Sequence, residues 1–470
     1  MIEQKTEIQK KGVKRMNKEN TKFQRNSQEK GITLIALVIT IVILIILATV
    51  TINFAFGGDG LIRRAEQASE FYANDTKYTD ESISNVTGYV DGVLSELGIE
   101  NGSGDNPGDD DTPTAPEGWD TSKVTPVVSY DRVTVPVPIG YTASDATGEN
   151  AVSSGFVIYE NVVNGTNEVN DENVEDAKLN RNQFVWVPVD DISQIANVAQ
   201  NGGIDSNGRT NYQGKLYNFD ADGAEEKTDY GQGTTSYREP DVVTGNSDGT
   251  GTQYDGSSTY VTNILRLADS NAFKTQLQEE FNEMIESVDT YGGFYIGRYE
   301  TGNLASNLGA EPVVVKSNNN IGDVNWYYMY QNSKLIKAND NVESTMIWGC
   351  MWDRTLIWLA ETNAENSANG KAYAEIANSS TWGNYSNNTE EGAGTRQETG
   401  YKESWKANNI YDLAGNVRDW TLEAYDTDGR VKRGGNYLNS GSGDPASYRD
   451  GSNPSNSMSS GGTRSALYVK

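Results

Sequence analysis

The chain has 470 residues, more than one ordinary hydrophobic core holds, so we expect one large domain with appendages or two domains. Its formal net charge of −28 argues against binding nucleic acid or anionic lipid through the bulk surface, because phosphate contacts need clustered Lys and Arg. The absence of histidine excludes Ser-His-Asp and Cys-His catalysis and histidine-ligated zinc or iron. The single cysteine, Cys350, cannot form an internal disulfide.

The N-terminal segments predict a membrane anchor. Residues 1–31 form a basic leader rich in Lys and Arg, which should stay on the cytoplasmic side. Residues 32–56 follow as a predicted transmembrane helix, because Ile32 to Ile52 carries no charge and a run of about 20 apolar residues spans a bilayer. We therefore expect a single-pass membrane protein whose C-terminal part lies outside the cell.

The junction between leader and span carries a recognisable motif. Lys30-Gly-Ile-Thr-Leu-Ile35 resembles the type IV prepilin cleavage and methylation site, which implies cutting after Gly31 by a prepilin peptidase and N-methylation of Ile32. Most pilins carry a glutamate at the fifth position after the cut, which pairs with a neighbouring pilin subunit during assembly, whereas this chain has Ala36. An uncleaved single-pass anchor remains the alternative.

Two connecting segments follow the span. Residues 57–100 begin with a glycine-rich break and then show apolar residues at helical spacing, which predicts short stalk helices. Residues 101–118 are rich in Asp, Gly and Pro with nothing to bury, which predicts a flexible linker.

Residues 119–470 predict a large α+β domain with little regular secondary structure. Helical spacing is clearest at 273–287 and 351–361, and the turn Asp426-Thr-Asp-Gly429 predicts a hairpin. Residues 200–262 are rich in Gly, Asn, Asp, Ser and Thr and predict a surface insertion of long loops. Short β-rich runs bounded by turn signals predict strands at 133–139, 156–159, 184–189, 293–299 and 430–433.

Several runs in this part, in the same chain order, resemble the formylglycine-generating enzyme (sulfatase-modifying factor) family, whose fold is C-type-lectin-like. The most specific is Asn409-Ile-Tyr-Asp-Leu-Ala-Gly-Asn-Val-Arg-Asp-Trp-Thr421, which is similar to the family's GLYDMAGNVWEWT signature. The others are Phe184-Val-Trp-Val-Pro-Val189, Gly293-Phe-Tyr-Ile-Gly-Arg-Tyr-Glu300, Arg433-Gly-Gly435 and Gly462-Thr-Arg-Ser-Ala-Leu467. The resemblance implies a lectin-like extracellular domain over 119–470.

The resemblance does not extend to the family's chemistry. Catalytic members hold copper with two cysteines just after the RGG run and related branches hold iron with histidines, whereas Asn436-Tyr-Leu-Asn-Ser440 contains neither residue type. We therefore expect no copper, no iron and no catalytic residues. If enzymatic activity survives, Glu300, Asp353 and Asp419 are the carboxylates to test.

A calcium site is the cofactor that the resemblance implies. In the family the AGNV loop wraps a structural calcium ion, and the matching positions are Asp412 and Asp419 through side chains and Gly415 and Val417 through backbone carbonyls. Hard oxygen ligands on a glycine-containing loop suit Ca²⁺. The alternative is that both aspartates cap turns and pair with Arg418 or Arg433.

The aromatic residues predict packing roles, and the order of the segments along the chain predicts a class of function. The run Trp348-Gly-Cys-Met-Trp352 favours a buried structural thiol at Cys350. Core packing is the favoured role of the aromatics, with a sugar-stacking platform as the alternative; they are Trp326, Tyr327, Tyr328, Trp348, Trp352, Trp358, Trp382 and Trp405. The plan of anchor, linker and head predicts a non-catalytic surface protein, either an adhesin that binds a glycan or host ligand or a minor pilin or pseudopilin in a filament. A membrane-tethered binding protein outside any filament and a diverged enzyme remain the alternatives.

Overall fold

The computed structural model describes residues 113–199, 202–227, 239–243, 260–309, 311–364, 369–426 and 429–470. They all belong to a compact unit, Asp111–Lys470, that is distinct from a first unit, Met1–Asp110. The predicted leader, transmembrane helix, stalk helices and most of the linker, with Gly31 and Ile32, therefore lie outside the described residues. Within the described ranges, no helix has the length and apolar character needed to cross a bilayer.

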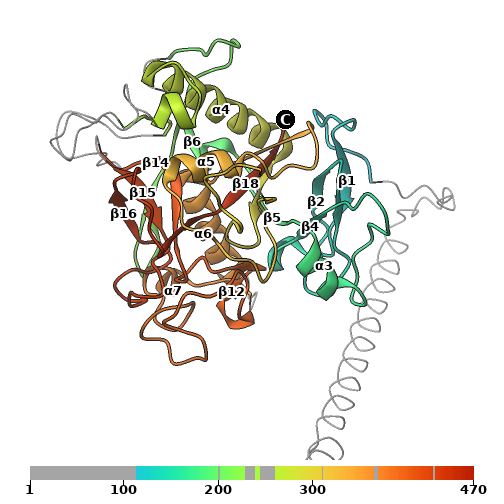
Figure 1. Ribbon diagram of the computed structural model, residues 1–470. Coiled ribbons are helices and arrows are strands. Elements are labelled where there is room, and N and C mark those ends of the chain that lie inside the picture. The colour runs from blue at the N-terminus through green and yellow to red at the C-terminus, as the bar shows by residue number, and fades with distance from the viewer. Residues whose placement is uncertain are drawn as a thin grey trace, which may run out of the picture. The chain divides into compact units, whose positions relative to one another are not determined.

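A six-stranded antiparallel sheet forms the centre of the described unit (Figure 1). Every residue of the inner strands β10 and β18 is buried, as expected for strands covered on both faces. In spatial order the strands are β11 (Val342–Met346), β18 (Ser465–Val469), β10 (Gly293–Gly297), β5 (Gln183–Pro188), β4 (Val157–Glu160) and β3 (Tyr141–Ala143). The strands expected at 156–159, 184–189 and 293–299 are confirmed, with β10 ending two residues early.

A second sheet of four strands is built from the C-terminal part of the chain. Its order is β16 (Arg449–Ser452), β15 (Arg430–Arg433), β14 (Arg418–Ala424) and β17 (Gly461–Thr463). Strand β17 pairs parallel with β14, whereas β14, β15 and β16 are antiparallel neighbours. The strand predicted at 430–433 is confirmed. The turn predicted at 426–429 includes residues 427–428, which lie outside the described residues; the flanking strands β14 and β15 pair antiparallel.

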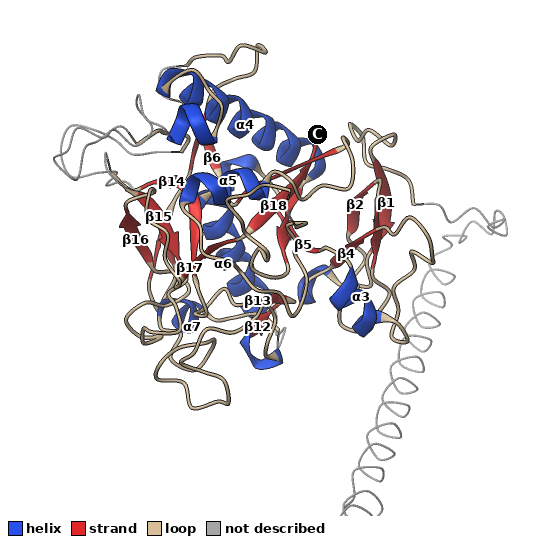
Figure 2. Ribbon diagram, in the orientation of Figure 1, coloured by secondary structure: helices blue, strands red, loops and turns tan. Residues whose placement is uncertain are grey.

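Helices cover the sheets (Figure 2). Helix α4 (Ser270–Tyr291) begins where the Asp269 side chain accepts a hydrogen bond from the Ala272 N–H and ends at Gly292, whose φ of 76° suits a glycine C-cap. Helices α4 and α6 (Gly349–Ala364) confirm the two predicted helices and extend beyond both predicted ranges. The shorter α-helices are α3 (Val174–Asn180), α5 (Trp326–Ser333) and α7 (Tyr373–Ala377).

The remaining elements are short hairpins and single turns, so the unit mixes helix and sheet with long irregular stretches. The two-stranded pairs are β1 (Val124–Val128) with β2 (Thr134–Pro138), β6 (Ala196–Val198) with β7 (Tyr212–Gly214), β8 (Tyr217–Phe219) with β9 (Ala224–Glu226), and β12 (Lys406–Ala407) with β13 (Ile410–Tyr411). Helical turns of other types are η1 (Val152–Ser154), η2 (Ile192–Gln194), η3 (Tyr260–Ile264) and η4 (Glu403–Trp405). The strand predicted at 133–139 is confirmed as β2.

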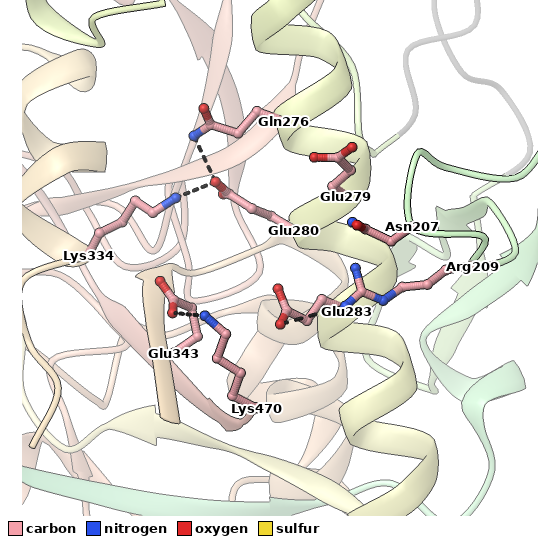
Figure 3. Close-up of a pocket in the computed structure, with 9 residues that line it drawn as sticks. All are labelled: Asn207, Arg209, Gln276, Glu279, Glu280, Glu283, Lys334, Glu343 and Lys470. Carbon is pink, nitrogen blue, oxygen red and sulfur yellow. Dashed lines mark hydrogen bonds and ion pairs between the residues drawn. The ribbon is translucent and has the colours of Figure 1, made fainter. Parts of the chain in front are cut away.

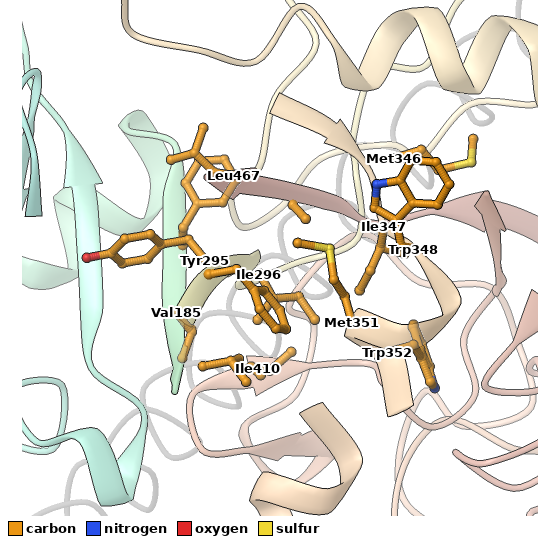
Figure 4. Close-up of a cluster of buried hydrophobic side chains, with 14 of the residues drawn as sticks. Val185, Tyr295, Ile296, Met346, Ile347, Trp348, Met351, Trp352, Ile410 and Leu467 are labelled. Carbon is orange, nitrogen blue, oxygen red and sulfur yellow. The ribbon is translucent and has the colours of Figure 1, made fainter. Parts of the chain in front are cut away.

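One large core joins the central sheet to α4 and α6. In Figure 4, Tyr295 and Leu467 of the sheet gather with Met351 and Trp352 of α6. The predicted core role of the aromatics is confirmed: all are buried except the half-buried Tyr328. Cys350 is buried too, as its apolar setting predicted.

The predicted surface insertion at 200–262 is only partly a surface feature. Leu216, Glu239, Val243 and Val261 are buried, so the expectation that this segment is too polar for the core is wrong at these positions. They are too widely spaced in a polar background to produce a recognisable hydrophobic period.

Candidate functional site

The AGNV loop, residues 412–419, leads from β13 into β14 and has an unusual backbone. Asp412, Gly415 and Asn416 all have left-handed conformations, with φ of 58°, 81° and 56°. A Cβ atom at Gly415 would lie 2.1 Å from the carbonyl oxygen of Asn384, so only glycine fits there. The local sequence therefore folds the loop tightly against residue 384 and turns its polar groups inward.

Three buried carboxylates meet at this loop around one arginine. Glu300 follows β10, whereas Asp412 and Asp419 belong to the loop, and the exposed fractions of the three residues are 0%, 2% and 0%. The Arg464 guanidinium donates to Asp419 Oδ2 at 3.4 Å and to the carbonyl oxygens of Gly297 and Tyr411 at 2.9 and 2.7 Å. Three ionisable acids thus share a single buried positive charge.

The hydrogen bonds of these carboxylates are unequal. Glu300 accepts from Asn416 Nδ2 at 2.6 Å and from the Val417 N–H at 3.1 Å. Asp412 accepts only a long bond, 3.3 Å, from the Gly400 N–H to its Oδ2. Within the described part of the chain, Asp412 Oδ1 and Asp419 Oδ1 are buried without a hydrogen-bond donor. Such bare anionic oxygens are costly unless a proton or a cation serves them.

The pKa values of the three acids also indicate that a proton or a cation is needed at this site. Burial raises the pKa of Asp412 to about 7 and that of Asp419 to about 6, and burial with the two neighbouring aspartates raises the pKa of Glu300 well above its usual range. Burial is the largest cause of each shift, so the ionised forms of these acids are disfavoured despite the charge of Arg464. A hard divalent cation suits this donor set.

The predicted calcium ligands fit this arrangement in part. Asp412 and Asp419 present the two bare oxygens, and the predicted set adds the carbonyls of Gly415 and Val417. Among the described residues, no group of three or more Asp, Glu, His or Cys side chains is arranged to hold a metal ion. A calcium ion here would therefore depend on backbone carbonyls and water as well as on the two aspartates.

The alternative pairing predicted for the two aspartates is wrong. Arg418 forms its ion pairs with Asp444 and Asp450, and Arg433 pairs with Asp353 at 2.5 Å. Arg418 lies in β14 and Arg433 in β15, and the side chains of both pair with acids outside the AGNV loop. The partner of Asp419 is Arg464, which the sequence did not predict; its only sequence signal is its place in the closing motif run.

The arginine that does serve the loop comes from the turn between β17 and β18, far from the AGNV loop in sequence. The sequence likewise predicted Glu300 only as a possible catalytic carboxylate and not as a neighbour of the AGNV loop, although it ends the Gly293–Glu300 motif run. The signal for both residues was their place in a run of the family resemblance, and the structure brings these runs together.

A second buried charge cluster surrounds Asp353, the remaining catalytic candidate. Its carboxylate accepts from Arg433 at 2.5 Å, from Arg449 at 2.7 Å and from the Tyr217 N–H at 2.8 Å. Asp353, Glu300 and Asp419 are all 0% exposed. Because no solvent reaches these carboxylates, a substrate could not reach them without a change of structure.

Next to this cluster lies a carboxylate that sequence reasoning missed. Glu239 is fully buried and accepts hydrogen bonds from the backbone N–H groups of Gly349 and Cys350. A Cβ atom at Gly349 would lie 3.0 Å from Glu239 Oε1 and 2.4 Å from Glu423 Oε2, so two carboxylates converge at this glycine. Burial, with the Glu423 charge second, raises the pKa of Glu239 to about 7.

Two polar loops distant in sequence are joined by hydrogen bonds. They are residues 379–401 and 436–448, the second ending just before β16, and both are rich in Ser, Gly, Asn and Tyr. Ser379 N–H and Ser386 N–H donate to the carbonyls of Gly441 and Asn439, each at 2.8 Å, and Gly441 N–H donates to Asn387 Oδ1 at 3.1 Å. These bonds hold the two loops, called here the paired loops, as one surface.

A charged surface hollow of about 350 Å³ lies along α4 (Figure 3). Its lysines and arginine are paired with glutamates, Lys334 with Glu280 and Lys470 with Glu343. Four glutamates and three basic residues line the hollow, and these ion pairs occupy most of its charged groups within the protein itself.

Comparison with known proteins adds two solved structures. No family model matches the chain, and no curated protein matches it. The Treponema denticola variable protein 1 is 17% identical over 38% of this chain and 85% of its own, with a TM-score of 0.25. CarF is 16% identical over 38% of this chain and 87% of its own, with a TM-score of 0.26. At these TM-scores the similarity supports no conclusion about fold or function.

Proposed function

We propose that residues 119–470 form a non-catalytic, C-type-lectin-like binding head, displayed outside the cell on a pilin-like membrane anchor and stabilised by calcium. The observation that carries the non-catalytic part is the burial of Glu300, Asp353 and Asp419, each 0% exposed. Without histidine and with its one thiol buried, the chain also lacks the His-activated nucleophiles of Ser-His and Cys-His enzymes.

The paired loops are the proposed ligand surface. Their composition resembles that of binding loops in general, in which Tyr supplies contact area and Ser, Gly and Asn supply adaptable hydrogen bonds. Leu438, on the second loop, is 62% exposed, and Tyr401, at the end of the first, is 44% exposed. Their cross-loop hydrogen bonds favour a surface ordered before binding, which reduces the entropy that a ligand must offset.

A glycan or a host surface protein is the proposed ligand class. The test is binding of the full chain, purified in detergent, to a glycan array and to immobilised mucin. Leu438→Asp should reduce binding at least tenfold, whereas Val163→Asp, at a position 97% exposed on another loop, should not. Failure of the wild-type chain to bind either target, or equal binding by both variants, would contradict the proposal.

The anchor part of the proposal has its own test. Cleavage by a prepilin peptidase would leave N-methylated Ile32 as the first residue, and mass analysis of protein from native membranes, with and without the peptidase, measures this directly. A processed chain supports a minor pilin or pseudopilin that contacts other pilin subunits. An uncut chain would leave a single-pass membrane-anchored head outside any filament.

The calcium part follows from the bare oxygens of Asp412 and Asp419. Calorimetric titration with CaCl₂ should show one site on the full chain, and Asp412→Asn should abolish it. Absence of any binding heat would remove calcium from the proposal and leave a site neutralised by protons.

A further inference from the structure

We propose that Glu300 is the residue that positions the AGNV loop for its calcium ion, although it lies outside the predicted ligand set. This inference rests on the proposed calcium site and goes beyond it, because it assigns a role to a carboxylate more than 100 positions away in the sequence. Glu300 connects the end of β10 in the central sheet to the loop.

Glu300 binds the backbone of the AGNV loop. One carboxylate oxygen accepts from the Val417 N–H at 3.1 Å. The next N–H, that of Arg418, donates to the Ser460 carbonyl at 2.9 Å. Since a peptide group is planar and trans, the second bond fixes the direction of the Val417 carbonyl. The two bonds together set both the position and the orientation of a predicted calcium ligand.

The second carboxylate oxygen of Glu300 binds a side-chain amide whose orientation is fixed. Glu300 Oε2 accepts from Asn416 Nδ2 at 2.6 Å. Asn416 Oδ1 is meanwhile held by Asn384 Nδ2 and by the Gln397 N–H, both at 3.0 Å, so the amide cannot flip. Glutamine at position 300 would have to turn its NH₂ group toward one of two donors. Only a carboxylate satisfies both contacts at once.

The charges around Glu300 also favour a cation at the loop. Glu300 is fully buried, and Asp412 and Asp419 are the negative charges that act on it most strongly. Arg464 is the positive charge that acts on the three acids. Binding of a divalent cation at the loop would therefore favour the ionised form of Glu300, even without contact between Glu300 and the ion.

The test compares Glu300→Gln with Glu149→Gln in the full chain in detergent. Glu149 is a matched control because it is also a buried glutamate with an arginine partner, Arg298, outside the AGNV loop. We expect Glu300→Gln to weaken calcium binding at least tenfold by calorimetry and to reduce the calcium-induced rise in Tm. Glu149→Gln should lower Tm with and without calcium equally and leave the calcium affinity within about twofold.

A third variant keeps the inference testable if Glu300→Gln does not fold. Glu300→Asp retains the charge but shortens the reach to Val417, so it should bind calcium more weakly than the wild type. Wild-type affinity in either folded Glu300 variant would overturn the inference while leaving the calcium site intact. A wild-type chain that binds no calcium would overturn both.

Discussion

Replacing Arg298 by methionine removes a buried positive charge that joins two parts of the chain. Arg298 Nη1 donates to Glu149 Oε1 at 2.7 Å and to the Tyr159 hydroxyl at 3.0 Å. The side chains of Arg298 and Glu149 are 0% and 5% exposed, so the variant leaves a carboxylate buried without its main partner. Removing one partner of a buried ion pair typically costs about 3–5 kcal/mol. Lys178 Nζ lies 3.8 Å from the same Glu149 oxygen and partly compensates for the lost arginine, so we expect a loss of unfolding free energy at the lower end of this range, about 3 kcal/mol.

The assay is urea unfolding of the full chain in detergent, followed by tryptophan fluorescence. The control is a double-mutant cycle with Glu149→Gln, which removes the stranded charge. We expect the double variant to be less destabilised than the sum of the two single variants, by about 2 kcal/mol. Additive effects, or a loss below about 1 kcal/mol in the Arg298→Met variant, would refute the reasoning that this pair is energetically coupled.

Three further predictions follow from the backbone and the buried titratable groups. Gly415→Ala should destabilise the protein by more than the roughly 1–2 kcal/mol that left-handed backbone strain costs, because the added Cβ atom would also clash with Asn384. Gly118→Ala is the control: Gly118 has a φ of 93° and open space around it, so this variant should show the backbone strain alone in the same urea assay. The pKa of Glu239 is raised to about 7 in the folded protein, so its contribution to stability is full below the ordinary pKa of 4.5 and is lost as the pH rises through 7. Urea unfolding at pH 5 and pH 8 should show a loss of stability that is smaller in Glu239→Gln than in the wild type, because Asp412 and Asp419 also have raised pKa values and contribute to the loss in both. An equal loss in the variant would contradict this. Burial raises the pKa of the Cys350 thiol, so a thiol reagent should label it only after unfolding, and rapid labelling of native protein would disprove its inaccessibility.

The sequence predicted regular elements well where a period or a strong turn signal was present. The helix at 273–287 has apolar residues at helical spacing and appears as α4. The β-rich run at 184–189 appears as β5. Strands β14 and β17 were missed because one carries charged residues in a family motif and the other is a glycine pair with one threonine.

The sequence predicted those site residues that are contiguous in one motif, but not those that reach the site through tertiary packing. The AGNV loop and its two aspartates could be identified because they are contiguous in one motif. Arg464 and Glu239 could not be, since each reaches its partner through tertiary packing rather than local spacing. A buried Glu in a segment of Gly, Asn and Asp looks like any solvated acid until the backbone donors of Gly349 and Cys350 are seen beside it.

The small cluster of Trp119, Val124, Tyr291 and Val469 has a consequence for engineering. The Trp119 and Tyr291 rings lie 5.9 Å apart at the end of α4, and Lys123 donates to the carbonyl oxygen of Lys470. Trp119 and Lys470 thus lie close to the same end of α4. A short bridge between them should permit circular permutation, with new ends opened at the exposed turn beside Gly165, or insertion of the whole unit into a loop of a host protein.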